Sequence, residues 1–120
     1  MLSHCIIDSV SDYTFNFKKL LNKKDIIIWK NCEDLKIKVD SRINKFIFEN
    51  CNNLTITLAD AIIGVEFNNC KNITIKVKKD KQINSFEIYK SNINLKISNK
   101  DYKKITFFKE NSQLFLNSNS

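Results

Sequence analysis

The chain has 120 residues, of which 42% are hydrophobic and 28% are charged, and its formal net charge is +7 at pH 7. These proportions exclude an intrinsically disordered chain and favour one globular domain over residues 1–120. No apolar run reaches the length of a membrane span and no signal-peptide pattern is present, so we expect a soluble, cytoplasmic protein.

One motif recurs six times along the chain, and each copy is centred on a dipeptide. In order, the dipeptides are Ser9-Val10, Asn31-Cys32, Asn50-Cys51, Asn69-Cys70, Lys90-Ser91 and Asn111-Ser112. Apolar residues alternate with polar ones on both sides of the dipeptide. This alternation is typical of half-buried strands, so each copy is predicted to hold two short strands joined at a corner.

The alternating apolar residues are expected to point into the core. In chain order they are Tyr13, Phe15 and Phe17; Ile27, Trp29, Leu35, Ile37 and Val39; Phe46, Phe48, Leu54, Ile56 and Leu58; Val65, Phe67, Ile73, Ile75 and Val77; Phe86, Ile88, Ile93, Leu95 and Ile97; Leu114 and Leu116. The last copy is weaker because Lys109 occupies an apolar position. Degenerate ends are typical of a repeat array.

These repeats predict an all-β fold, a short right-handed parallel β-helix of about six coils. A third short stretch is expected to close each coil, around Leu20/Leu21, Ile43, Ile62/Ile63, Ile83 and Tyr102. A β-sandwich is the competing fold, but the identical phase of the copies argues against it. The absence of proline and the single glycine also disfavour its tight hairpins. A weak helical period is confined to Phe15–Asn22.

The corner between the two strands is predicted to carry two structural ladders. Small side chains are expected to face inward there, and a free cysteine behaves as a small buried hydrophobe. Asparagine tolerates the backbone angles of a corner and bonds to a neighbouring coil. The thiol ladder comprises Cys32, Cys51 and Cys70, and the amide ladder comprises Asn31, Asn50, Asn69 and Asn111. Cys5 is assigned an equivalent buried role.

A metal or redox site is the alternative interpretation of these cysteines, and geometry weighs against it. Cys32 and Cys70 are expected roughly 10 Å apart, two coils of ~4.8 Å, which is too far for both to bind one zinc ion. Adjacent corner cysteines have parallel Cβ vectors, which suits a disulfide poorly. No phosphate-binding loop or catalytic motif is present, so we predict no metal, no cofactor and no enzymatic activity.

The segment "FENCNNLTITLADAIIGVEFNNCKNITIKV" (48–77) resembles the C-terminal domain of cyclase-associated protein, a regulator of actin monomers. In that family an Asn-Cys corner and its strand lead into an aspartate, a glycine-containing turn and a glutamate, which Asp60, Gly64 and Glu66 match. Weaker similarity continues through 83–98 and 112–116. The chain is similar to a minimal, apicomplexan-like member that lacks the helical, proline-rich and WH2 segments of larger members.

This resemblance implies binding of monomeric actin, with sequestration or faster nucleotide exchange. Family members form dimers by exchanging strands beyond the last coil, and their extreme C-terminus contacts actin. This chain ends at "FLNSNS", so a homodimer through the C-terminal edge is left open.

A more distant resemblance links the chain to tubulin-binding cofactor C, which acts on GTPases through an arginine finger. A finger places fixed positive charge on the transferred phosphoryl group. The matching positions here are Ile28, Ile47, Glu66 and Glu87, and Arg42 is the only arginine. We therefore expect no GTPase-activating activity.

The outward residues of the strands after the corner form the candidate actin-binding face. They are Lys36, Lys38, Thr55, Thr57, Thr74, Lys76 and Lys96, with Asn94 in the same columns. A basic face suits acidic actin. A solvated sheet surface is the simpler interpretation, and the rival patch contains Ile47, Glu49, Glu66 and Asn68.

The alternative function is a scaffold β-helix that binds another protein or an anionic surface. Two basic loops motivate it, namely Lys78, Lys79 and Lys81, and Lys100, Lys103 and Lys104. Outward aromatic residues are scarce, so specific nucleic-acid binding is not predicted.

Overall fold

Two parallel sheets face each other in the computed structural model, which describes residues 4–18 and 25–118. The first sheet contains the odd-numbered strands β1 (His4–Asp8), β3 (Ile26–Lys30), β5 (Ile43–Glu49), β7 (Ala61–Asn68), β9 (Ser85–Tyr89) and β11 (Thr106–Glu110). The second contains the even-numbered strands β2 (Ser11–Phe17), β4 (Glu33–Val39), β6 (Asn52–Leu58), β8 (Lys71–Val77), β10 (Asn92–Ile97) and β12 (Gln113–Ser118).

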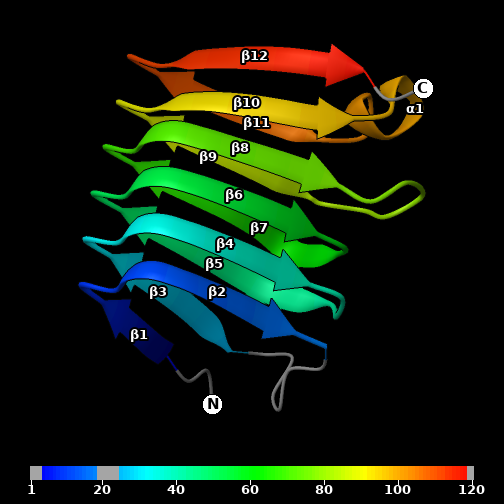
Figure 1. Cartoon of the computed structure of the whole chain (residues 1–120). Helices are drawn as coiled ribbons and strands as arrows, with labels where there is room; N and C mark the ends of the chain where they lie inside the picture. The colour runs from blue at the N-terminus through cyan, green and yellow to red at the C-terminus, as the bar shows by residue number, and fades with distance from the viewer. Residues whose placement is uncertain (1–3, 19–24, 119–120) are drawn as a thin grey trace.

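Each strand pairs with the strand two places along the chain, so the chain winds upward as a right-handed β-helix (Figure 1). Its two ends lie at opposite ends of the stack. The predicted fold class is confirmed, with six strands in each sheet. No helix among the described residues is long and apolar enough to cross a membrane.

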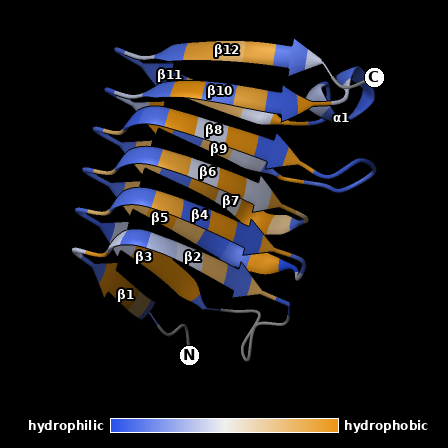
Figure 2. Ribbon diagram, in the orientation of Figure 1, coloured by the Kyte–Doolittle hydropathy of each residue, from blue (hydrophilic) through white to orange (hydrophobic). Residues whose placement is uncertain are grey.

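The sheets are in register, which places equivalent repeat positions above one another. Ile37 pairs with Ile56, and Ile56 pairs with Ile75. Figure 2 shows the resulting alternation of apolar and polar residues along the strands. The inward residues are buried from Ile27 to Ile97, so the core is continuous through the middle coils.

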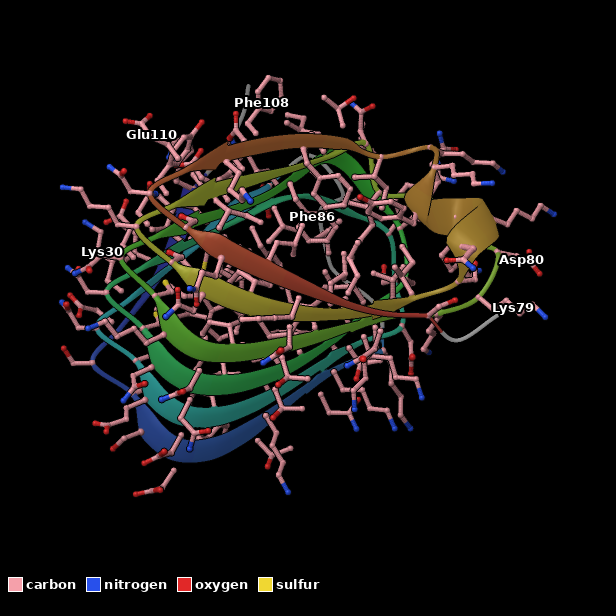
Figure 3. The ribbon with its side chains drawn as sticks, turned by 90° about the horizontal axis from the view of Figure 1, so that it is seen from above. Lys30, Lys79, Asp80, Phe86, Phe108 and Glu110 are labelled. Atoms are coloured by element: carbon pink, nitrogen blue, oxygen red, sulfur yellow. The ribbon has the colours of Figure 1, made fainter. Side chains whose placement is uncertain are left out.

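Aromatic rings stack along the core axis. The rings of Trp29 and Phe48 lie 5.6 Å apart at an interplanar angle of 12°. The rings of Phe48 and Phe67 follow at 5.0 Å and 7°. Seen from above, Phe86 lies between the two sheets whereas Phe108 points away from them (Figure 3).

The left-handed backbone at the corners explains the choice of asparagine. The first dipeptide position has a φ between 49° and 59° in every copy, at Ser9, Asn31, Asn50, Asn69, Lys90 and Asn111. A second such position, which the sequence did not reveal, follows three residues later at Asp12, Asp34, Asn53 and Asn72, with φ between 52° and 57°. Asparagine and aspartate adopt this region more readily than other non-glycine residues.

Phe15 and Phe17 lie in β2, as the first copy of the repeat predicts. The weak helical period over Phe15–Asn22 does not produce a helix at these two residues, and residues 19–22 lie outside the described part. The third stretches that were expected to close the coils take several forms. Ile43 begins β5, and Ile62 and Ile63 lie within β7.

The later coils close in a different way. Ile83 forms a single bridge with Ala61, and Tyr102 ends a short helix, α1 (Asn99–Tyr102). Leu20 and Leu21 lie outside the described residues.

Cys5 is exposed, contrary to the expectation of a buried role. It pairs in register with the buried Ile27 and so has the inward orientation. Cys5 lies in the first coil, however, and no coil among the described residues lies beyond it.

Candidate protein-binding face

The predicted face is built by two neighbouring columns of outward residues on the even-numbered sheet. In one column Lys36 pairs with Thr55, Thr55 with Thr74, and Thr74 with Asn94. In the other, Lys38 pairs with Thr57, Thr57 with Lys76, and Lys76 with Lys96. The structure therefore brings all seven predicted residues together, and we call this surface the lysine–threonine face.

The lysine–threonine face carries four lysines that have no ion-pair partner among the described residues. Lys36, Lys38, Lys76 and Lys96 are all exposed. Lys76 and Lys96 are direct cross-strand neighbours, an arrangement of like charges that is unfavourable in an isolated sheet. An acidic partner would relieve this repulsion.

Four further residues, which were not among the predicted ones, belong to the same two columns at their ends. They are Thr14, Asn16, Phe115 and Asn117. The repeat register was the signal that could have identified them, because β2 and β12 continue the columns of β4 and β10.

A hollow lies at the end of this face and is lined by Lys76, Lys79 and Lys96 together with Val77 and Ser98. The loop that carries Lys79 is held against α1, as the positions of Lys79 and Asp80 in Figure 3 show.

The buried carboxylate of Asp101 makes this attachment. It accepts hydrogen bonds from the Asp80 backbone N–H at 3.0 Å and from the Ser98 hydroxyl at 2.8 Å. The two predicted basic loops are therefore adjacent, and Lys79 of the first loop lies beside Lys76 and Lys96 at the end of the lysine–threonine face.

The rival patch on the odd-numbered sheet differs because its charges are paired. The Lys45 ammonium lies 3.1 Å from Glu66 Oε1 and 3.3 Å from Glu87 Oε2. Asn68 donates a hydrogen bond of 2.8 Å to Glu66 Oε2. Lys30 lies 4.0 Å from Glu49. This compensation leaves little net charge to attract a partner.

The pKa values of this network follow from the same contacts. Burial lowers the pKa of Lys45, but hydrogen bonds and charges from Glu66 and Glu87 outweigh burial and leave it above 10.5. Burial raises the pKa of Glu66, but bonds with Asn68, Glu87 and Lys45 leave it below 4.5. The bond with Glu66 raises the pKa of Glu87, and burial adds to this.

The residues of the family turn motif have separate structural contacts. Asp60 Oδ1 accepts a 2.8 Å hydrogen bond from the Gln82 backbone N–H, which links neighbouring coils. Gly64 has a φ of +147° and lies against the Ser85 backbone. Glu66 is the carboxylate that binds Lys45. The motif therefore positions β7 on its neighbours and does not converge on one site.

The two corner ladders differ in their contacts. Asn69 donates a hydrogen bond of 2.8 Å to Asn50, whereas Asn31 donates one of 3.3 Å to Asp8. The thiols of Cys32, Cys51 and Cys70 are buried.

Each thiol contacts backbone carbonyls of its own coil and the coil before it, as Cys70 does with Asn68 and Phe48 at 3.5 Å. Burial raises the pKa of Cys32. A hydrogen bond with Cys70 and burial raise the pKa of Cys51. No group of three or more potential metal ligands occurs among the described residues.

Comparison with known proteins adds two similarities. Residues 12–98 match the family model described as adenylate cyclase associated (CAP) C terminal. The fold is similar to the crystal structure of the cyclase-associated protein from Cryptosporidium parvum, with a TM-score of 0.68 and 17% sequence identity. That match covers 98% of this chain and 66% of the other, so this chain spans just under two thirds of that protein. A search of curated proteins finds no match.

Proposed function

Because this chain belongs to the family of adenylate cyclase-associated protein C-terminal domains, we propose that it binds monomeric actin through the lysine–threonine face. The observation that carries this proposal is the register of Lys36, Lys38, Lys76 and Lys96 on one exposed sheet surface without ion-paired partners among the described residues. Actin is acidic, and complementary charge favours both encounter and correct orientation.

The rigidity of the surface supports the same proposal. The face is formed by parallel strands whose neighbours are paired in register, so little conformational entropy is lost on binding. The bound actin would be sequestered, or would exchange its nucleotide faster, in the cytoplasm. The domain would do this without catalysing a reaction or activating a GTPase.

A binding experiment with matched variants tests this function. The double substitution Lys38→Glu/Lys76→Glu reverses two charges in one column of the face, and we expect it to weaken binding to monomeric actin at least tenfold. Nucleotide exchange on actin should change with the wild type and not with this variant. Unaltered actin binding by Lys38→Glu/Lys76→Glu would refute the assignment to this face.

The control variant Lys103→Glu/Lys104→Glu makes the same change in charge at exposed positions beyond α1. It should bind actin like the wild type. It also tests the second candidate function, a scaffold that binds an anionic surface, which the adjacent basic loops around Lys79 and Lys100 favour. If the domain does not bind actin but binds anionic vesicles, and only the loop variant loses this, the second function replaces the first.

A further inference from the structure

Strand β7 contains one residue more than each of its neighbours near its beginning. Two residues of β7, Ile62 and Ile63, lie opposite a single residue of β5, Asn44. On the other side, the three residues of β7 between Ala61 and Val65 lie opposite only two residues of β9. An extra residue of this kind forms a β-bulge, which bends the strand and redirects its side chains.

The bulge exposes two large apolar side chains in succession. Ile62 is 50% exposed and Ile63 is 40% exposed, although regular alternation along a strand would turn one of them inward. The Ser85 hydroxyl donates a hydrogen bond of 3.0 Å to the Ile63 carbonyl, and Gly64 lies against the Ser85 backbone. The isoleucine pair is therefore presented on a backbone that is fixed by the next coil.

A hollow of about 280 Å³ lies beside the bulge. Arg42, Asp60 and Gln82 stand above one another in three successive coils along it, because each directly precedes a member of one paired column. Ile62 and Asn84 complete its lining, together with the small Ala61. The hollow is slightly smaller than a typical ligand pocket, so it suits a few side chains of a peptide better than a large cofactor.

The polar groups of this hollow are available for a ligand. Arg42 forms no ion pair with a described residue. Gln82 and Asn84 use only their backbone groups in hydrogen bonds with described residues. A guanidinium binds a carboxylate through two parallel hydrogen bonds, and a side-chain amide can both donate to and accept from a peptide backbone.

The combination of an arginine with an apolar pair favours a peptide over a nucleic acid. Bases stack on aromatic side chains, and none of the described residues that line the hollow is aromatic. The Asp60 carboxylate would repel an acid in the middle of the hollow, so the acid of a ligand belongs beside Arg42. The exposed Lys81 nearby, which has no ion-pair partner among the described residues, also favours an acidic ligand.

We propose that the bulge of β7 and the hollow beside it bind a short, extended peptide of a partner protein, one that combines an aspartate or glutamate with neighbouring aliphatic residues. The acid pairs with Arg42, and the aliphatic side chains pack against Ile62 and Ile63. The amides of Gln82 and Asn84 bond to the peptide backbone.

This site is separate from the lysine–threonine face. The beginning of β7 belongs to the odd-numbered sheet and lies on the same side of the stack as α1 (Figure 1). The lysine–threonine face belongs to the even-numbered sheet. The proposal therefore does not depend on actin binding, and either one can fail without the other.

An array of end-blocked pentapeptides tests the proposed chemistry on the whole chain. The array contains every combination of valine, leucine, aspartate, glutamate, lysine and serine. We expect the chain to retain peptides in which an acid adjoins valine or leucine, and to lose them when lysine replaces the acid or serine replaces the aliphatic residues. No retained peptide, or retention that depends on acid content alone, would overturn the proposal.

Matched variants then locate the site with the peptide that binds best. Arg42→Gln and Ile62→Ser should each weaken its binding by about tenfold or more, as loss of a charged or apolar anchor does. Lys104→Gln makes the same change in charge at an exposed position, and Phe108→Ser removes an apolar group that is 51% exposed. Both controls should bind the peptide like the wild type. Equal losses in the controls and the site variants would overturn the assignment.

Nuclear magnetic resonance titration with the same peptide gives a direct readout of position. The side-chain amide signals of Gln82 and Asn84 and the methyl signals of Ile62 should shift, and those of Lys76 and Lys96 should not. Shifts confined to Lys76 and Lys96 would overturn the proposal. Displacement of the peptide by an equal concentration of inorganic phosphate would do so too, because the hollow would then be a simple anion site.

Discussion

Gly64 lies against Ser85 so closely that a Cβ atom at Gly64 would stand 2.2 Å from the Ser85 carbonyl oxygen. The φ of Gly64 is +147°, which other residues rarely adopt. We therefore predict that Gly64→Ala lowers the free energy of unfolding by about 3 kcal/mol or more, because steric overlap adds to backbone strain. Urea denaturation measures this.

The neighbouring Ile63, which is 40% exposed, provides a control for that substitution. Ile63→Ala should cost about 1 kcal/mol, less than Gly64→Ala, because the side chain is only partly buried and alanine introduces no steric overlap. Equal effects at the two positions would contradict the role assigned to the Gly64–Ser85 contact.

A gain of stability is expected at Lys90. Lys90 has a φ of 50° at the first position of its corner dipeptide. In the other five copies this position is asparagine or serine, with φ between 49° and 59°. We predict that Lys90→Asn raises the free energy of unfolding by about 0.5–1 kcal/mol, because asparagine is less strained there and bonds to its neighbours. Thermal unfolding should show a melting temperature several degrees higher. The converse change, Asn50→Lys, should lower it.

The thiols should differ sharply in reactivity. Cys5 is exposed, whereas Cys32, Cys51 and Cys70 are buried, and burial helps to raise the pKa of Cys32 and Cys51. We predict that one thiol per native chain reacts quickly with a disulfide reagent. The other three should react only at the rate of unfolding, and faster in urea. Rapid modification of more than one thiol in native buffer would contradict this.

The size of the corner side chain should matter more than its sulfur. Ser91 already occupies this column, and its hydroxyl donates a 2.8 Å bond to the Tyr89 carbonyl. Cys70→Ser should therefore cost about 1 kcal/mol, whereas Cys70→Leu should cost about 2–3 kcal/mol through overpacking. Denaturant unfolding of the two variants makes the comparison. A larger loss for serine than for leucine would contradict the steric account.

The contribution of Glu66 to stability should vanish in acid. Its pKa in the folded protein lies below 4.5, so its contribution is fully present above that value and is lost as the pH falls through the folded pKa. We predict that Glu66→Gln lowers the melting temperature at pH 7 and that the gap from the wild type closes well below pH 4.5. A gap that stays constant or widens in acid would refute the importance of the Lys45 contact.

The repeat made most of the fold predictable because its phase alone determines which residues face inward. The spacing of Cys32, Cys51 and Cys70 was enough to predict the register of their strands, and Ser91 extended it to the strand of Lys96. That register brought the seven face residues together.

The repeat pattern does not predict which long side chains extend to residues of a neighbouring copy. Lys45 contacts Glu66 and Glu87, which lie 21 and 42 positions further along the chain. It pairs in register with Gly64, so its long side chain reaches these carboxylates diagonally.

Local irregularities of the backbone also could not be predicted from the repeat pattern. The pairing of β5 with β7 shifts register between Ile43 and Lys45. Helix α1 depends on one cap, because the Ser98 hydroxyl accepts a hydrogen bond from the Asp101 backbone N–H. A single serine followed by an aspartate is too short a pattern to stand out from loop sequence. Cys5 is exposed because it lies in the first coil, at the end of the stack. The repeat pattern alone does not distinguish this end coil from a middle one.

Because the coils stack in register, the length of the molecule along the axis of the β-helix can change only in whole coils. Each coil contacts the coils on either side of it, so an extra copy of residues 50–68, one repeat long, could be inserted between β4 and β6 without altering the phase of its neighbours. Every insertion would lengthen the outer surface by ~4.8 Å, the spacing between strands. Natural or designed relatives with more or fewer coils could thus fit partners of different size while keeping the same kinds of side chain on their surface.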